Sequence, residues 1–400
     1  MRTATETFTA GVARDDPASG TRRFRIDGFD VEVIETASAL DAVSYEWRAI
    51  EQSSNHAAVF QSFPLLQIWA RHFCTGSDTG GLHITIVRKD GRAILILPLQ
   101  VSGMSLMRIA RIAGDPITQY SEILVDPAFA TRETLQVAFN AARAAGIAAI
   151  VFRRVRDDSN LLALAGPILR APSNRSEAPF VDLSRFADFP AFLASRSRKL
   201  RHSLRNRRKH LSKEGEFRFE IVRGAEARSA VAEALDLKRK WLVQRGAIST
   251  AFVDPATREC LLDLAESSSS GAVIERLVVR GETAAIRFGF KYRGTHFAFM
   301  GAYASAFRHA SPGKLLTEFC FSGFQERNFS RFDFLPPGGP HKSEWCSDAI
   351  GVTDYTLPLT GMGQIYARGY QERLRPALRA VWQRTPETLR SLAAALFLRV

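Results

Sequence analysis

Three short segments in the second half of the chain decide the fold: HFAFMGA at residues 296–302, SPGKLL at 311–316 and FSRFDF at 329–334. The first and third are apolar runs with the length and composition of buried strands. The second is a helix start, because Ser311 is a favourable N-cap and Pro312 suits the first helical position. We therefore predict a strand, a helix that ends near Asn328, and a second strand that ends at Phe334.

The start of this helix has the composition of an anion-binding site. Gly313 carries no side chain, so a ligand can approach the backbone closely. The helix dipole and the free N–H groups of the first turn favour a phosphate there. Ser311 and Leu315 also belong to this candidate site. Arg308 and Lys314 would add positive charge. The alternatives are an ordinary capped helix and two solvated basic side chains.

The two halves of the chain share one order of elements: a hairpin, a capped helix and a buried strand. In the second half the hairpin turns at Arg280-Gly281-Glu282, and in the first half at Lys89-Asp90-Gly91. The helix of the first half covers 131–145 and leads into strand Ile147–Phe152. It begins Thr131-Arg132-Glu133-Thr134, where a carboxylate satisfies the helix dipole and repels an anion. We therefore expect the second copy to bind a phosphate and the first to be structural or to help bind an acceptor.

Periodicity and turn residues place the other elements. Strands are predicted at Phe24–Ile34, Phe217–Val222 and Val352–Leu359, and helices near Ala37–Glu51, around Trp69, and at Phe189–Gly215, Ala225–Arg245 and Pro255–Ser267. Together they predict an α/β (α+β) fold of two tandem domains, each with a mixed, mostly antiparallel sheet flanked by helices.

Asp333, His341 and Lys342 are the candidate catalytic residues. Asp333 ends a buried strand between two phenylalanines, so its carboxylate is either paired or has a raised pKa, as a general base requires. His341 could act as a base at neutral pH, and Lys342 could stabilise charge on an acceptor or an oxyanion. The alternative is a salt bridge between Asp333 and Lys342 that holds the following loop.

The chain is basic, with 54 Lys and Arg against 41 Asp and Glu and a net charge of +13. This excess attracts polyanions such as nucleic acid, acidic lipid or phosphorylated cofactors, without choosing among them. Nine basic residues fall within 196–213, on a helix with an apolar seam of Leu200, Leu204 and Leu211. This helix either binds an anionic acceptor, a lipid surface or RNA, or is a solvated face. RNA is disfavoured because no aromatic residues are interleaved with the arginines.

Several classes of protein are excluded by missing motifs. The four cysteines form no CxxC pair and lie near no His at zinc-ligand spacing, so we expect free thiols and no metal. The chain contains no P-loop, HExxH, GxSxG or GxGxxG motif. The polar start of the chain and the lack of a long apolar run lead us to expect a cytoplasmic protein, with peripheral contact to an inner membrane left open.

Residues 25–350 resemble GNAT-type acetyltransferases of the CelD-like family, which occurs in exopolysaccharide and cellulose biosynthesis and is similar to the FemAB/FemX aminoacyl transferases. The resemblance is carried by Ser197-Arg198-Lys199-Leu200-Arg201, Ser311-Pro312-Gly313-Lys314-Leu315-Leu316, Phe332-Asp333-Phe334, and Gly338-Gly339 to Lys342 with Trp345. The loop Leu335 to Pro340 is richer in proline than the family's Asp-Phe-x-x-Gly pattern.

The resemblance implies an acyltransferase with acetyl-CoA or another acyl-CoA as co-substrate. It implies a non-catalytic GNAT-like domain over 23–185 and an acyl-CoA-binding GNAT domain over 186–360. Composition predicts a disordered N-terminus over 1–22 and a basic helical tail over 361–400. The acceptor would be a sugar or sugar-lipid precursor of bacterial exopolysaccharide or cell envelope. Two alternatives remain: a FemX-like transferase that uses aminoacyl-tRNA, and a non-catalytic scaffold that docks on an acidic membrane or a synthase complex.

Overall fold

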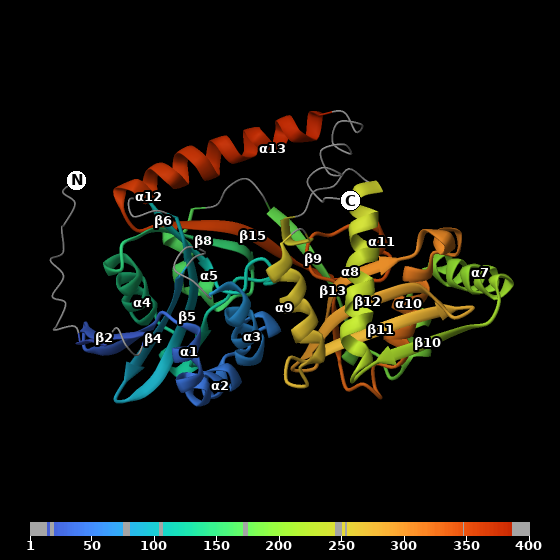
Figure 1. Ribbon diagram of the computed structural model, residues 1–400, viewed down its shortest axis with the longest axis horizontal. Coiled ribbons are helices and arrows are strands. Elements are labelled where there is room, and N and C mark those ends of the chain that lie inside the picture. Colours follow the sequence, from blue (N-terminus) through green and yellow to red (C-terminus); the bar gives the residue numbers. More distant parts are fainter. Residues whose placement is uncertain are drawn as a thin grey trace. The chain divides into compact units, whose positions relative to one another are not determined.

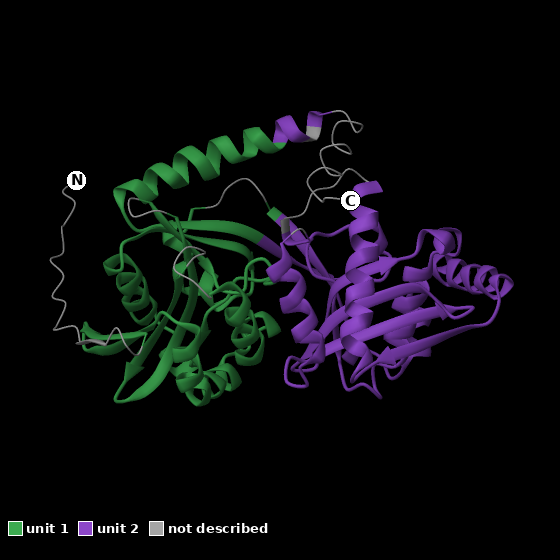
Figure 2. Ribbon diagram, viewed as in Figure 1, with its two compact units in different colours: residues 1–175, 353–379 green, residues 176–352, 380–400 purple. Residues whose placement is uncertain are grey.

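The computed structural model describes residues 14–16, 20–74, 81–103, 107–170, 175–244, 250–252, 254–346 and 348–385. The chain divides into two compact units (Figure 2). Unit 1 consists of residues 1–175 and 353–379, and unit 2 of residues 176–352 and 380–400. The domain limits at 185/186 and 360/361 stay predictions. Most of the stretch 1–22 lies outside the described residues.

Unit 1 is built on a mixed sheet with the strand order β1-β2-β3-β4-β5-β6-β8-β15, and β7 pairs with β5 (Figure 1). Its strands are β1 Arg14–Asp16, β2 Thr21–Ile26, β3 Phe29–Ile34, β4 Gly81–Lys89, β5 Arg92–Ser102, β6 Arg108–Ile112, β7 Leu124–Val125, β8 Ile147–Arg156 and β15 Asp348–Pro358. Its helices are α1 Ala37–Leu40, α2 Ser44–Ser53, α3 Phe63–Phe73, α4 Arg132–Ala144 and α5 Asn160–Ala165. Neighbours from β1 to β6 are antiparallel, whereas β6 and β8 are parallel.

Unit 2 contains mixed strands in the order β9-β14-β13-β12-β11-β10. Its strands are β9 Arg175–Asp182, β10 Phe217–Val222, β11 Ala272–Val279, β12 Glu282–Tyr292, β13 Thr295–Tyr303 and β14 Arg331–Asp333. Its helices are α6 Phe189–Ser195, α7 Arg198–Glu214, α8 Glu226–Gln244, α9 Pro255–Glu266, α10 Pro312–Ser322 and α11 Pro340–Ser343. Strands β13 and β14 pair in parallel, and the other pairings among the described strands of unit 2 are antiparallel.

The predicted fold class is confirmed, and the two units share the predicted order of elements. In unit 1 the hairpin β4–β5 precedes the parallel pair β6 and β8, which α4 connects. In unit 2 the hairpin β11–β12 precedes the parallel pair β13 and β14, which α10 connects. A parallel pair needs such a crossover helix, because the chain must return to the same end of the sheet.

Three predicted elements differ from the structure. The strand predicted at Phe24–Ile34 is a hairpin of β2 and β3, because Asp27 and Gly28 both take positive φ angles and reverse the chain. The helix predicted at Phe189–Gly215 is two helices, and the side chain of Ser197 caps the second. Helix α10 ends at Ser322, six residues before the predicted Asn328, because Gly323 forms its C-cap. Strands β6 and β9 were not predicted.

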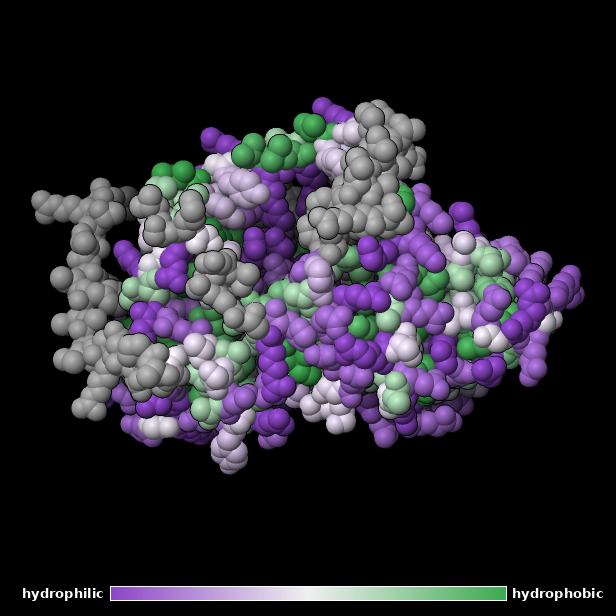
Figure 3. Space-filling model, viewed as in Figure 1, coloured by the Kyte–Doolittle hydropathy of each residue, from purple (hydrophilic) through white to green (hydrophobic). Residues whose placement is uncertain are grey.

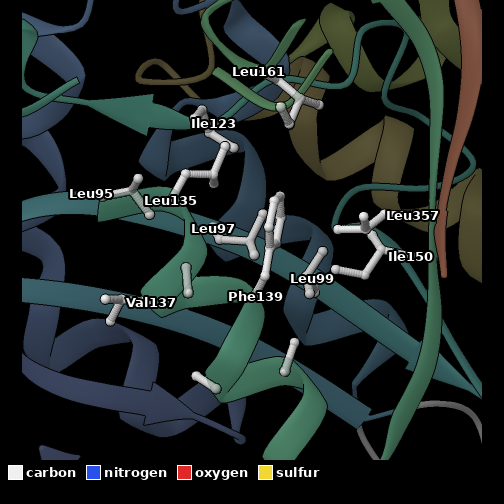
Figure 4. Packing of buried hydrophobic residues seen from close by; sticks show 14 of the residues in the cluster. Leu95, Leu97, Leu99, Ile123, Leu135, Val137, Phe139, Ile150, Leu161 and Leu357 are labelled. Atoms are coloured by element: carbon white, nitrogen blue, oxygen red, sulfur yellow. The ribbon is translucent and has the colours of Figure 1, made fainter. Parts of the chain in front are cut away.

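Hydrophilic residues cover most of the surface seen in Figure 3, and the apolar side chains are gathered inside each unit. In unit 1 Leu95, Leu97 and Leu99 share one face of β5, where Leu97 and Leu99 lie beside Phe139 of α4 and Leu95 lies nearer Leu135 (Figure 4). In unit 2 the predicted seam of α7 is buried with α10, in a core that includes Leu315 and Trp345.

The tail predicted as helical is helical as far as it is described. It consists of α12 Gly361–Ile365, a π-helical segment Tyr366–Leu374 and α13 Arg375–Arg384. Among the described residues, no helix has the length and apolarity to cross a membrane. The same residues contain no cluster of three or more His, Cys, Asp or Glu side chains that could hold a metal ion.

Candidate functional site

The start of helix α10 lacks the side-chain cap expected for it. Ser311 is the N-cap residue, as predicted, but its backbone is left-handed, with φ 49° and ψ 57°, and its side chain makes no cap hydrogen bond. An N-cap side chain reaches the first turn from an extended backbone, so this conformation prevents the bond. The Lys314 N–H instead donates to the Ser311 carbonyl at 3.0 Å.

The corresponding helix of unit 1 is capped by its own residues. Thr131 has the extended backbone that Ser311 lacks, and its hydroxyl accepts a hydrogen bond from the Thr134 N–H at 3.2 Å. Glu133 adds a negative charge in the first turn. Helix α4 therefore satisfies its own N-terminus, while that of α10 remains available to another partner.

Gly313 faces open space in unit 2. A Cβ atom built on Gly313 would meet no other atom within 4 Å, so packing does not require a glycine at this position. Helix geometry leaves the N–H groups of a first turn without helical acceptors. The adjacent Leu315 side chain is fully buried in the core, so Leu315 can offer a ligand only its backbone. The geometry permits the close backbone approach predicted for Gly313.

The positive charge beside α10 is arranged differently from the prediction. The Lys314 ammonium lies 2.6 Å from a carboxylate oxygen of Glu344, just after α11, so its charge is largely compensated. Arg308 is exposed, and its carbonyl accepts a hydrogen bond from the Ser311 N–H at 3.1 Å. Arg207 of α7 was not singled out from the sequence. Its guanidinium donates to the His309 carbonyl at 2.6 Å, just before α10.

One edge of strand β13 is only partly paired. Strand β14 pairs with β13 through three residues, from Thr295↔Arg331 to Phe297↔Asp333. Beyond Phe297, β13 continues to Tyr303 while β14 has ended, and the only strand neighbours of β13 among the described residues are β12 and β14. The backbone from Ala298 to Tyr303 therefore has no strand partner on the β14 side within the described residues. We call this stretch the open edge of β13, and the chain continues from it to α10.

Asp333 and Lys342 are brought together around the loop that follows β14. Asp333 is buried, and its carboxylate accepts a hydrogen bond from the Leu335 N–H at 2.8 Å. The Lys342 ammonium donates to the carbonyl of Leu335 at 2.7 Å and to that of Pro337 at 2.8 Å. Burial lowers the pKa of Lys342 to about 8, and the negative charge of Asp333 opposes this shift. Both residues hold the loop through hydrogen bonds to its backbone, and their catalytic roles stay predictions.

The neighbours of this pair limit its chemistry. His341 lies exposed in the short helix α11. Burial raises the pKa of the Cys346 thiol to about 12, so this cysteine is protonated near neutral pH and is a poor nucleophile. Arg287 of β12, missed in the sequence, lies close enough for its charge to lower the pKa of Lys342. Lys238 of α8 acts on Lys342 in the same way, so the site contains a buried carboxylate and three half-buried cations.

Two side chains of helix α10 hold Arg287 by hydrogen bonds. Its guanidinium donates to the Thr317 hydroxyl at 2.6 Å and to the Cys320 sulfur at 3.2 Å, and it lies over the Phe332 ring. No short-range sequence pattern reveals this position, because β12, α10 and β14 meet only in the folded unit. Arg287 links the packing of α10 to the end of β14, where Asp333 lies.

Comparison with known proteins agrees with this geometry. Residues 198–343 match the family model described as an acetyltransferase (GNAT) domain. The structure is similar to the crystal structure of FemX, with a TM-score of 0.59 and 11% identity over 82% of this chain and 98% of that one. It is also similar to the C-terminal domain of a putative lysylphosphatidylglycerol synthetase from Agrobacterium fabrum, with a TM-score of 0.52 and 14% identity over 82% and 95% of the two chains.

A third similar structure is a conserved protein of unknown function from Bacteroides thetaiotaomicron, with a TM-score of 0.51 and 11% identity over 78% and 97% of the two chains. A search of curated proteins by sequence gave no match. At these identities the structural likeness shows a shared fold. Residues 198–343 thus match the model of a GNAT acetyltransferase domain, and the chain shares its fold with FemX over most of its length.

Proposed function

We propose that the chain is an acyl-CoA-dependent N- or O-acyltransferase whose donor binds with its pyrophosphate at the start of α10. The observation that carries this proposal is the contrast between α10 and α4. Thr131 and Glu133 satisfy the first turn of α4, whereas Ser311 leaves that of α10 uncapped beside an open space at Gly313. The helix dipole and free N–H groups favour a phosphate there. Arg207, which contacts the His309 carbonyl just before α10, and the exposed Arg308 would supply positive charge.

The open edge of β13 suits the amide-containing arm of the donor. An extended chain with amide groups can add to a free strand edge through backbone hydrogen bonds. The edge from Ala298 to Tyr303 leads toward α10, so one ligand could bind both features. The unpaired N–H groups of this edge are also the donors that we assign to the oxyanion of the acyl group.

Transfer would proceed directly between bound donor and acceptor. The acceptor hydroxyl or amine attacks the thioester carbonyl and loses its proton to Asp333, or to His341 in the second assignment. The tetrahedral oxyanion collapses, the C–S bond breaks, and the CoA thiolate leaves and takes up a proton. The Lys342 ammonium stabilises the negative charge that develops. Proximity of the two bound substrates supplies much of the rate.

For the acceptor we propose a sugar or sugar-lipid precursor of bacterial exopolysaccharide or cell envelope. The CelD-like resemblance of the sequence supports this choice. The names of two similar structures, FemX and a putative lysylphosphatidylglycerol synthetase, are compatible with an envelope acceptor. A lipid-linked acceptor would bring a cytoplasmic enzyme to the inner surface of a membrane.

A second candidate keeps the fold and replaces acyl-CoA by aminoacyl-tRNA. The observation in its favour is the basic helix α7, which lies beside the start of α10 through Arg207 and through Ser203, whose hydroxyl is 3.5 Å from the Lys314 ammonium. A long row of cations beside a phosphate site would suit a nucleic acid. A non-catalytic scaffold is the third candidate, and it predicts no donor binding at all.

Calorimetric titration of the full chain with acetyl-CoA, in the absence of tRNA, separates these candidates. We expect saturable binding, and release of free CoA thiol when an amino sugar is added. Binding of aminoacyl-tRNA without any binding of acetyl-CoA would replace the first candidate by the second. If the chain binds neither donor, the scaffold remains.

A further inference from the structure

Large apolar side chains are exposed on the C-terminal helical segment, which comprises α12, the π-helical segment and α13. Among the described residues, ten large hydrophobic side chains are exposed, and seven of them belong to this segment. They are Met362, Ile365, Tyr370, Leu374, Leu378, Val381 and Trp382. Hydrophobic residues line the upper side of this helix in Figure 3. Isolated exposed apolar residues are common, but a contiguous group indicates a binding surface.

The last residue of the π-helical segment and three apolar residues of α13 form one stripe. Leu374, Leu378 and Val381 follow the i, i+4, i+7 spacing, and Trp382 lies next to them. At about 100° per residue these four side chains fall within about 100° of the helix circumference. We call this group the apolar stripe. Val381 is 65% exposed and Leu378 is 55% exposed, so both side chains are largely accessible to solvent.

Arginines border the apolar stripe on both sides. The same helical geometry places Arg373 and Arg384 along one border, and Arg375 and Arg379 along the other. Arg375 is engaged, since it donates to Gln371 at 2.9 Å and lies 3.6 Å from Asp354. The other three are exposed and pair with no carboxylate in the part of the chain that the structure describes. The border is therefore strongly positive.

The first half of the C-terminal helical segment is anchored to unit 1. Gly363 lies so close to strand β8 that an added Cβ would be 1.8 Å from the Ala148 carbonyl oxygen. Ala367 and Gln371 are buried one and two turns further along. The Glu372 carboxylate also lies 3.9 Å from the Arg170 guanidinium. These contacts hold the first half of the segment against unit 1.

We propose that the apolar stripe and its arginine border are a docking surface for a membrane that carries anionic lipid. An interfacial helix buries its apolar face among the acyl chains near the headgroups, while long basic side chains reach the phosphates. Trp382 is suited to the same boundary, since its ring is apolar and its N–H can bond to headgroups. The positive border favours an anionic membrane over a second copy of the chain, because the arginine borders of two copies would repel each other. The proposal does not depend on acyl transfer.

Vesicle flotation of the full chain tests the proposal. We expect flotation with vesicles of phosphatidylcholine and about 30% phosphatidylglycerol, and at least tenfold less with phosphatidylcholine alone. The variant Leu378→Ser/Val381→Ser should lose binding at least tenfold, because it removes apolar area from the stripe. Arg379→Glu/Arg384→Glu should lose as much and should remove the salt dependence. All four side chains are exposed, so thermal unfolding should be unchanged.

The matched control is Tyr45→Ser/Ile168→Ser, which removes two exposed apolar side chains elsewhere in unit 1 and should float like the wild type. A further variant, Leu396→Ser/Phe397→Ser, alters apolar residues beyond the described part of the tail. The proposal is overturned if the wild type does not float with anionic vesicles. It is also overturned if Leu378→Ser/Val381→Ser floats normally, if only the 396/397 variant loses binding, or if sedimentation shows a dimer that dissociates in Leu378→Ser/Val381→Ser.

Discussion

Substitution of Gly313 by glutamate tests the donor site directly. The new carboxylate would occupy the open space in front of the first turn of α10, where the donor pyrophosphate is proposed to bind. At a separation of about 5 Å and an effective dielectric constant of about 20, two unit negative charges repel by about 3 kcal/mol. Screening at physiological ionic strength reduces this, so about 2–3 kcal/mol remains. We therefore expect acetyl-CoA binding to weaken roughly 30- to 150-fold.

The same substitution should not weaken the fold. Glycine is a poor helix former, and glutamate in the first turn gains about 0.5–1 kcal/mol in propensity and adds a favourable charge at the helix N-terminus. The midpoint of thermal unfolding should therefore stay constant or rise. This separates a loss of binding from a loss of structure, and both are measured on one preparation by calorimetric titration and a thermal melt.

Gly361→Glu is the matched control. Gly361 is the first residue of α12 in unit 1, and a Cβ built there also meets no atom within 4 Å. The charge change and the position in a first turn are the same, so any general effect of added negative charge appears in both variants. Gly313→Ala, which adds only a methyl group, should lose little binding. Equal affinity of Gly313→Glu and wild type for acetyl-CoA, or an equal loss in Gly361→Glu, would refute the assignment.

Three further predictions follow from the two helix starts and from the loop after β14. If Lys342 acts as a cation, kcat should fall as pH rises through its pKa of about 8, and Lys342→Met should have low activity without that inflection; activity that rises through pH 8 contradicts this role. Asp333→Asn should move the inflection to lower pH, because the Asp333 carboxylate favours the charged form of Lys342; an unchanged inflection would separate the two residues. Thr131→Ala should lower the free energy of unfolding by about 1 kcal/mol in urea, whereas Ser311→Ala should cost much less because its hydroxyl makes no cap bond; equal losses would contradict the cap assignments.

The pKa of Lys342 also gives its contribution to stability a defined sign. The folded-state pKa of about 8 lies below the ordinary value of 10.5, so between these values the unfolded chain binds more protons than the folded one. The free energy of unfolding should therefore rise with pH across that window, relative to Lys342→Met. Paired urea titrations of the two proteins at pH 7.5 and 10 measure this difference.

Local chemistry explains which parts of the fold were predictable. The start of α10 was recognised from Ser311, Pro312 and Gly313, because caps and first-turn residues act within a few positions of the chain. The turn at Asp27-Gly28 carries an equally local signal, but the apolar pattern on both sides of it predicts one continuous strand. Gly323 is likewise a local signal for the end of α10, but the apolar pattern predicts that the helix continues to Asn328.

Long-range packing explains what could not be predicted. Strand β9 is polar at its start and pairs with β14 about 150 positions later, so only the folded sheet identifies it. The ion pair of Lys314 with Glu344 and the contact of Arg207 with the His309 carbonyl also join residues far apart in the chain, so they too are visible only in the folded structure. Periodicity identifies α7 as a basic amphipathic helix, but no pattern in the sequence states which helix it packs against.

The place of β15 in unit 1 has a consequence for biosynthesis. Residues 353–358 complete a sheet whose other strands end at Arg156, and the Asp354 carboxylate accepts a hydrogen bond from the Arg154 N–H across 200 positions of the chain. A ribosome must therefore make residues 176–352 of unit 2 before unit 1 can close. Until then the edge of β8 is an unpaired template for other chains. Nascent chains that stall before residue 353 should aggregate through unit 1, although its residues are the first to be synthesised.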